Sequence, residues 1–259
     1  MREFQVGSLH AYDTGGDGIA VLWHHGTPNI GTPPGPLRRS GIRWISYDRP
    51  GYGGSAPHPG RGLGDAADCA ARVADALGLE RFAVAGHSGG GSHALACAAR
   101  LTDRVSAVLS ISALAPFDAE GLDWFAVMGP NGEATLLAAA AGRTYEAENV
   151  DFIAADWAMF EGPWSWFSEV VEPAVAGGRE GQDADDRAYT SAWGCDPAAI
   201  AAPTLLLHGG GDLVVPGAHG EWLAARIPGA ELRLSPEDGH ISVLRHADAA
   251  VDWLVARAS

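Results

Sequence analysis

Three side chains of the types used in nucleophilic catalysis follow one another along the 259-residue chain in the order serine, aspartate, histidine. Ser88 lies among glycines, Asp212 follows a glycine-rich turn, and His240 follows a glycine. A serine hydroxyl is a weak nucleophile at neutral pH, and it needs a base that is itself oriented by a carboxylate. The pattern therefore predicts that Ser88 attacks an electrophilic carbon, with His240 as the base and Asp212 as the orienting carboxylate.

The glycines around Ser88 predict a sharp turn between a strand and a helix. An apolar run, residues 82–85, precedes Gly86-His87-Ser88-Gly89-Gly90-Gly91, and an alanine-rich run, residues 92–100, follows it. This is the G-x-S-x-G pattern of a nucleophile elbow, in which glycines let the backbone turn tightly beneath the serine. The amide of Gly89 then stands at the start of a helix, where a developing negative charge is favoured.

Other polar residues compete for the same roles. Asp118 follows a predicted strand and is an alternative to Asp212, which we prefer because it comes directly after an apolar strand. His87 and His93 flank the predicted elbow, and we expect structural roles for both. The three preferred side chains each follow a different predicted strand, so they would meet at the carboxyl edge of a parallel sheet, where ligands bind in open α/β folds.

The elements that must position these residues alternate between strands and helices. The predicted strands are 4–6, 9–12, 19–23, 42–47, 82–85, 105–111, 204–207 and 231–234, and the predicted helices are 63–77, 92–100, 217–227 and 243–257. Continuous apolar runs are typical of strands that are buried on both faces. The sequence therefore predicts an α/β fold with a doubly wound, mostly parallel sheet of about eight strands.

Residues 116–198 interrupt this alternation. They contain five tryptophans, helical patterns near 133–141 and 150–160, and an acidic run at 183–187. We expect an inserted helical cap over a core formed by residues 1–115 and 199–259. Trp124, Trp157 and Trp164 are candidates for lining a substrate pocket, although aromatic residues in a small lid can also form its own core.

Composition narrows the classes of partner. The formal net charge of −15 argues against nucleic acid and anionic membrane surfaces, which need clustered lysine and arginine. Three cysteines without metal-ligand spacing indicate neither a disulfide framework nor a zinc site. No signal sequence or bilayer-spanning apolar run is visible, so we expect a cytoplasmic protein that acts on a small molecule without a metal or cofactor. The oligomeric state stays open.

Five motifs together resemble the α/β-hydrolase family over nearly the whole chain. They are His25-Gly26-Thr27-Pro28, the glycine-rich run Asp48–Ser55, the predicted elbow, His208-Gly209-Gly210-Gly211-Asp212, and Gly239-His240. The resemblance implies a serine hydrolase with the Ser88-His240-Asp212 triad. It also implies that the amides of Thr27 and Gly89 form the oxyanion site, and that Asp48–Ser55 is a structural turn.

The resemblance implies cleavage of a carboxylic ester or lactone through an acyl-enzyme, and several alternatives remain. A serine at position 88 argues against relatives that use an aspartate nucleophile, namely haloalkane dehalogenases and epoxide hydrolases. A proline iminopeptidase-like amide hydrolase would use cap acids such as Glu161, Glu169 and Glu172 to bind an amine. A C–C bond hydrolase would use the same triad, and a member of another class would bind a small molecule without turnover.

Overall fold

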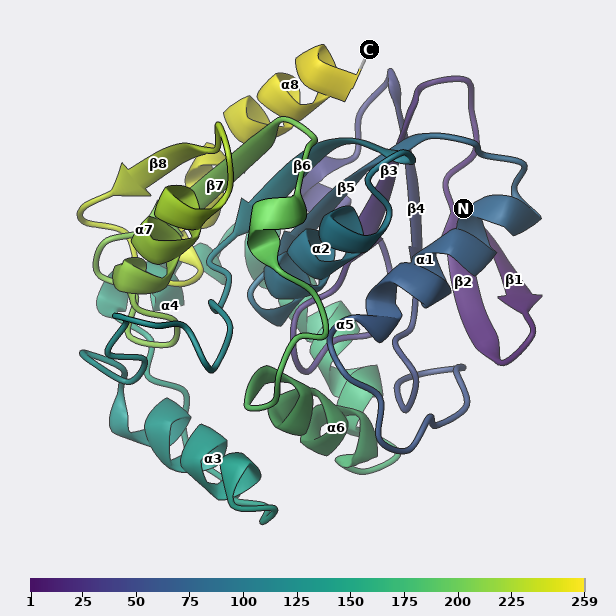
Figure 1. The fold of residues 1–259 in the computed structure, drawn as a ribbon. Helices are drawn as coiled ribbons and strands as arrows, with labels where there is room; N and C mark the ends of the chain where they lie inside the picture. The colour runs from purple at the N-terminus through teal and green to yellow at the C-terminus, as the bar shows by residue number, and fades with distance from the viewer. Residues whose placement is uncertain (259) are drawn as a thin grey trace.

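The computed structural model describes residues 1–258, and its strands form one eight-stranded sheet in the order β1-β2-β4-β3-β5-β6-β7-β8 (Figure 1). The strands are β1 (Arg2–Val6), β2 (Leu9–Asp13), β3 (Ile19–His24), β4 (Ile42–Tyr47), β5 (Phe82–His87), β6 (Val105–Ile111), β7 (Thr204–Gly209) and β8 (Glu231–Ser235). The pairs β1–β2 and β2–β4 are antiparallel, and the others are parallel. The predicted fold class is confirmed.

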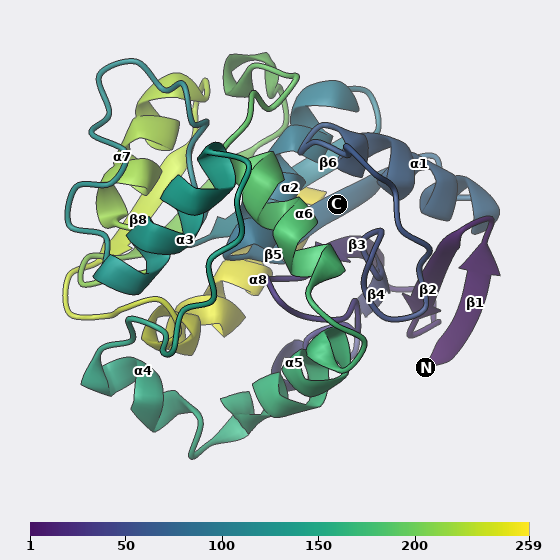
Figure 2. The same cartoon turned by 90° about the horizontal axis from the view of Figure 1, so that it is seen from below.

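Helices cover both faces of the sheet (Figures 1 and 2). On one face lie α1 (Asp65–Ala76), α2 (Gly89–Arg100) and α7 (Gly217–Arg226), and α8 (Ala247–Ala258) lies on the other. Short 3₁₀ helices occur at Gly35–Leu37, Pro163–Trp166, Pro197–Ala199 and Ser242–His246. Among the described residues, no helix combines the length and the apolar character needed to cross a membrane.

Two hydrophobic clusters explain why the central strands are apolar throughout. Side chains alternate between the faces of a strand, so neighbouring residues enter opposite clusters. Leu22 and Val84 pack on the side of α1 and α2, whereas Val21 and Ala83 pack on the side of α8. With both faces covered, these strands sit rigidly in the interior and hold the loops at their carboxyl ends in fixed positions.

The regular elements of the chain between β6 and β7 are all helices. It contains α3 (Pro130–Ala140), α4 (Ala154–Met159), α5 (Phe167–Val175) and α6 (Glu180–Tyr189). The sequence indicated only two helices here, near α3 and α4. Helix α5 contains Pro173, a residue that disfavours a helix interior, although its buried residues Phe167, Val170 and Ala174 recur at helical spacing, and α6 is strongly acidic. Charged and polar contacts, described below, hold α6 against the sheet.

Candidate active site

Ser88 stands at a strained turn between β5 and α2. Its backbone has φ 58° and ψ −134°, a left-handed region that non-glycine residues rarely occupy. The turn is tight enough that a Cβ at Gly86 would collide with the backbone of Gly90, and one at Gly90 would collide with the carbonyl of His24. Glycines are therefore required at both positions, as the elbow pattern predicts. Ser88 is half-buried and lines a cavity of about 600 Å³.

His240 and Asp212 form a buried pair at the ends of β8 and β7. The Nδ1 atom of His240 lies 2.7 Å from Oδ2 of Asp212, and Oδ1 of Asp212 accepts hydrogen bonds from the amides of Val214 and Val215 at 2.8 Å each. Burial acts to raise the pKa of Asp212, but His240, together with His208 and the hydrogen bond from the Val215 amide, outweighs it and leaves the pKa below its ordinary value. Asp212 is thus an ionised carboxylate that orients the imidazole.

Ser88 and His240 line the same cavity. Within residues 1–258, Ser88 Oγ makes no hydrogen bond to the His240 ring. Such contacts are often long before substrate binds and tighten in the reacting complex. The arrangement places a hydroxyl and an oriented imidazole at one cavity wall.

Thr27 and Gly89 lie beside Ser88 with free amides. Strands β3 and β5 are paired in parallel with His24 opposite Gly86, so the loop after β3 lies against the elbow. Thr27 lines the cavity, and Gly89 is the first residue of α2. Neither of these two backbone N–H groups donates a hydrogen bond to another described residue. Two free N–H groups beside a serine can donate hydrogen bonds to the oxyanion that forms when the serine attacks a carbonyl, and so stabilise its charge.

A carboxylate that the sequence did not single out holds the loop that carries His240. Asp156 of α4 is almost fully buried and accepts hydrogen bonds from the amides of His240 at 3.2 Å, Ile241 at 2.9 Å and Ser242 at 2.7 Å. In the sequence Asp156 is one acid within a helical stretch, with no local feature that sets it apart. Its role depends on a contact between segments that lie 84 to 86 residues apart.

The cavity is mainly apolar and aromatic. Its lining residues include Phe152, Trp157, Phe160, Phe167, Val171 and Ile241. Of the three tryptophans expected at the substrate, only Trp157 lines the cavity, with its side chain 55% exposed. Trp124 and Trp164 do not line this cavity, because both indoles pack inside the protein. Trp124 donates from Nε1 to the carbonyl of Ala115, and Trp164 stacks on Phe167.

The alternative candidates lie in different surroundings. Asp118 is exposed and lines a separate cavity with Trp222 and Arg226, so it does not contact His240. Of the three acids considered for amine binding, Glu172 lines the Ser88 cavity, whereas Glu161 and Glu169 are exposed elsewhere.

The two histidines beside the elbow make backbone contacts. His87 donates from Nε2 to the carbonyl of His240 at 2.9 Å and also lines the cavity. His93 donates from Nδ1 to the carbonyl of Gly89 at 2.8 Å. Burial lowers the pKa of both, to about 3 for His87, so both rings are neutral at pH 7.

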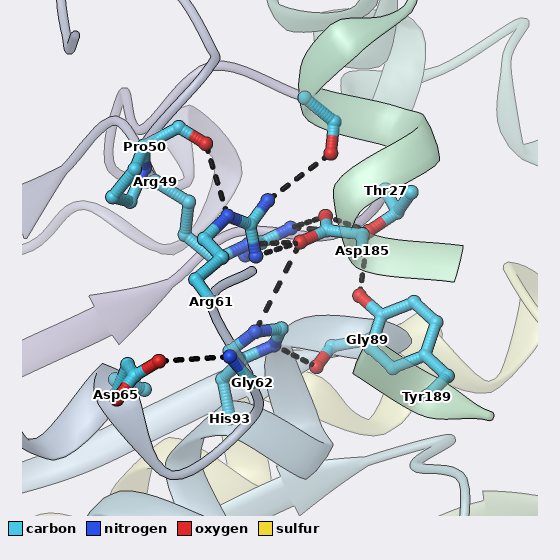
Figure 3. A network of polar contacts seen from close by, with 12 residues as sticks. Thr27, Arg49, Pro50, Arg61, Gly62, Asp65, Gly89, His93, Asp185 and Tyr189 are labelled. Carbon is cyan, nitrogen blue, oxygen red and sulfur yellow. Dashed lines mark hydrogen bonds and ion pairs between the residues drawn. The ribbon is translucent and has the colours of Figure 1, made fainter. Parts of the chain in front are cut away.

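A buried ionic cluster of Arg49, Arg61 and Asp185 lies next to Thr27 (Figure 3). Asp185 of α6 is fully buried, and its carboxylate lies 2.6 Å from Nη2 of Arg49 and 2.7 Å from Nη1 of Arg61. Burial acts to raise the pKa of Asp185, but the two guanidinium groups outweigh it and hold the pKa well below its usual range. Arg49 belongs to the run Asp48–Ser55, which the sequence indicated only as a turn. The sequence feature that could have pointed to this ionic cluster is the arginine inside a glycine-rich motif.

Replacing Asp185 by alanine is expected to lower the free energy of unfolding by about 3–5 kcal/mol, because Arg49 and Arg61 would be left buried without a counter-charge. Asp183→Ala on the same helix is the matched control. Asp183 forms a partly exposed pair with Arg179, so its loss is expected to cost about 0.5 kcal/mol. Chemical denaturation of both variants measures the difference. Equal losses would contradict a structural role for the ionic cluster.

Among the described residues, no group of three or more histidine, cysteine, aspartate or glutamate side chains is arranged to hold a metal ion.

Comparison with known proteins places this geometry in a family. The family model described as "alpha/beta hydrolase fold" matches residues 19–247. Similar curated proteins include 2-hydroxy-6-oxononadienedioate/2-hydroxy-6-oxononatrienedioate hydrolase from Comamonas testosteroni, 26% identical over 93% of this chain and 87% of the relative. Another is 2-hydroxy-6-oxo-6-phenylhexa-2,4-dienoate hydrolase from Burkholderia cepacia, 27% identical with the same coverage of each chain.

Solved structures show the same fold. The enol-lactonase from Burkholderia xenovorans superposes with a TM-score of 0.71, covering 98% of each chain at 21% sequence identity. The family match spans most of the chain and includes the loops that carry Ser88, Asp212 and His240. The protein therefore belongs to the α/β-hydrolase fold family and is a hydrolase.

Proposed function

We propose that this protein cleaves a small to medium neutral carboxylic ester or lactone through an acyl-enzyme on Ser88. The observation that carries the proposal is that one cavity wall brings the catalytic groups together. This wall holds Ser88 at a strained turn and His240, which is bonded to buried Asp212, and the free amides of Thr27 and Gly89 lie beside the serine. These groups supply a nucleophile, a base and an oxyanion site.

The first half of the reaction forms the acyl-enzyme. His240 Nε2 takes the proton of Ser88 as Oγ bonds to the ester carbon, and the carbonyl oxygen becomes an oxyanion held by the Thr27 and Gly89 amides. Asp212 keeps the proton of His240 on Nδ1 and stabilises the imidazolium. The tetrahedral intermediate collapses, the bond to the alkoxy oxygen breaks, and His240 returns the proton to that oxygen.

The second half repeats these roles with water. His240 removes a proton from water as the water oxygen attacks the acyl carbon. The bond to Ser88 Oγ then breaks, and the proton returns to Oγ, which releases the carboxylic acid and restores the enzyme. Every proton that His240 takes up in the cycle is returned to an oxygen, so one turnover consumes one ester and one water and restores the triad.

The proposal includes a division into a hydrolase core, residues 1–115 and 199–259, and a helical cap, residues 116–198. Two contacts support it. Asp156 of α4 bonds to the His240 loop, and Asp185 of α6 bonds to Arg49 and Thr27 at the ends of β4 and β3. Helices from this segment thus reach both sides of the carboxyl edge of the sheet, where a cap would enclose a substrate.

The charge of the cavity favours a neutral substrate. Among the described residues that line it there is no lysine or arginine, and Glu172 adds a carboxylate at its wall. Moving a substrate carboxylate from water into apolar surroundings without a counter-charge is costly. The aromatic lining instead suits an apolar acyl or alkoxy group.

A C–C bond hydrolase is the second candidate function. The names of the two curated relatives describe a hydrolase of a dienedioate and a trienedioate and a hydrolase of a dienoate, and each relative aligns over 93% of this chain. The same triad could serve such a reaction. The absence of a cation among the cavity's described lining residues weighs against a carboxylate substrate, and for this reason we place the ester first.

We expect p-nitrophenyl valerate to be hydrolysed with at least about tenfold higher kcat/KM than the p-nitrophenyl monoester of succinic acid, which has a similar size but carries a carboxylate. Burying that charge beside Glu172 without a cation accounts for the difference. Release of nitrophenolate measures both rates, and spontaneous hydrolysis is subtracted for each ester. Faster cleavage of the charged ester, or turnover of 2-hydroxy-6-oxo-6-phenylhexa-2,4-dienoate alone, would favour the C–C hydrolase.

A further inference from the structure

The hydroxyl of Thr27 is held by three groups from elsewhere in the chain. Its Oγ1 lies 2.6 Å from Oδ2 of Asp185, 2.7 Å from the hydroxyl of Tyr189 and 3.0 Å from Nη2 of Arg49. Asp185 and Tyr189 both belong to α6, as Figure 3 shows. Two of the three partners therefore come from a helix that lies 158 to 162 residues from Thr27 in sequence.

The direction of each hydrogen bond follows from the charges. Asp185 is ionised between two arginines and can only accept, so Thr27 donates its proton to that carboxylate. Arg49 can only donate to Thr27. The remaining lone pair of Thr27 Oγ1 must then receive the proton of Tyr189. The hydroxyl thus makes every hydrogen bond open to it, and the Thr27 side chain has one fixed orientation.

The peptide that carries the oxyanion donor is held at its other end. Nη2 of Arg49 also donates to the carbonyl of Gly26 at 3.0 Å. This carbonyl and the Thr27 N–H belong to one planar trans-arranged amide group, so fixing the oxygen also fixes the direction of the N–H. The ionic cluster therefore sets both the side chain and the backbone of Thr27.

Tyr189 also contacts the second oxyanion residue. A Cβ at Gly89 would collide with the Tyr189 hydroxyl, so this hydroxyl occupies the space beside the Gly89 backbone. Tyr189 is buried and does not line the cavity, and it therefore acts from behind the site.

We propose that Tyr189 is a positioning residue for the oxyanion site: its hydroxyl, by bonding to Thr27 and packing on Gly89, holds the two amide donors at the spacing that the reaction requires. The inference rests on the proposed acyl transfer at Ser88. An oxyanion site acts through donors fixed in advance of the reaction, and a displacement of about 1 Å can cost about 100-fold in rate. Helix α6 thereby takes part in catalysis without touching substrate.

The test measures kcat and KM for p-nitrophenyl valerate in Tyr189→Phe, Thr27→Val and the double variant. Each single variant is expected to lower kcat by about 10- to 100-fold with KM changed less than about threefold, because the loss falls on the transition state. The kcat of the double variant is expected to lie within about twofold of that of the less active single variant, since Thr27→Val already removes the hydrogen bond that Tyr189→Phe removes. Thr27→Ser, which keeps the hydroxyl, is expected to recover most of kcat.

Tyr52→Phe is the matched control. Tyr52 donates to the same carboxylate oxygen of Asp185 at 2.9 Å, so this variant removes a tyrosine hydroxyl from the cluster without touching Thr27. Its kcat is expected to stay within about twofold. If Tyr189→Phe and Tyr52→Phe lower the melting temperature alike and leave kcat unchanged, Tyr189 is merely structural and the inference is wrong. If Thr27→Val does not fold, the comparison of kcat between Tyr189→Phe and Tyr52→Phe still tests the inference.

A second readout separates this inference from the proposed function. A fluorophosphonate reacts with an activated serine to give an adduct whose oxygen occupies the oxyanion site, so its labelling rate should fall 10- to 100-fold in Tyr189→Phe and not in Tyr52→Phe. Labelling of the unmutated protein without ester turnover would reject the ester while the labelling rates still test Tyr189. No labelling at all would contradict both the Ser88 nucleophile and this inference.

Discussion

Replacing Ser88 by alanine is expected to lower kcat for ester hydrolysis by about 10⁴- to 10⁶-fold, which is the scale seen when the nucleophile of a serine triad is removed. Alanine deletes only the hydroxyl, so the acyl-enzyme cannot form. The oxyanion amides and the cavity remain, and KM is expected to change little. Steady-state kinetics with p-nitrophenyl valerate measures the loss, and mass spectrometry should locate a fluorophosphonate adduct on Ser88 in the unmutated protein.

Ser191→Ala is the control for this experiment. Ser191 is exposed, lies outside the Ser88 cavity and donates to the carbonyl of Arg187, so its removal is expected to leave kcat within about twofold. Residual activity of Ser88→Ala within about tenfold of the unmutated protein would show that another group starts the reaction. A fluorophosphonate adduct on a different serine would lead to the same conclusion.

Replacing Asp212 by asparagine is expected to lower kcat by about 10⁴-fold. Asp212 accepts the Nδ1 proton of His240 and so leaves Nε2 free to act as the base. An amide at this position can donate to Nδ1, which favours the tautomer with its proton on Nε2, and it also lacks the charge that stabilises the imidazolium. The variant keeps nearly the same shape, so circular dichroism is expected to show a folded protein.

Asp118→Asn is the matched comparison for Asp212→Asn. Asp118 is exposed and lines a cavity separate from that of Ser88, so its replacement is expected to change kcat by less than about twofold. The two variants are compared at the same pH and with the same ester. A larger loss at Asp118 than at Asp212 would make Asp118 the acid of the triad and would contradict our assignment.

The sequence by itself determined the sheet and the order of its loops. Alternation of apolar strands with helices is a local property, because burial on both faces leaves a continuous apolar run such as residues 19–23. The elbow at Ser88 is also local, since a turn of this tightness needs glycines at 86 and 90. Parallel connection then places Asp212 and His240 at the same sheet edge as Ser88.

Only the tertiary structure decided how the segment between β6 and β7 meets this edge. An acidic run such as residues 183–187 is typical of a solvated helix face, and nothing in its spacing shows that Asp185 is buried between Arg49 and Arg61. The same holds for Asp156, and for the tryptophans, whose side chains fill either a core or a cavity. Ion pairs and aromatic packing depend on partners distant in the chain, and the chemical character of one segment does not identify them.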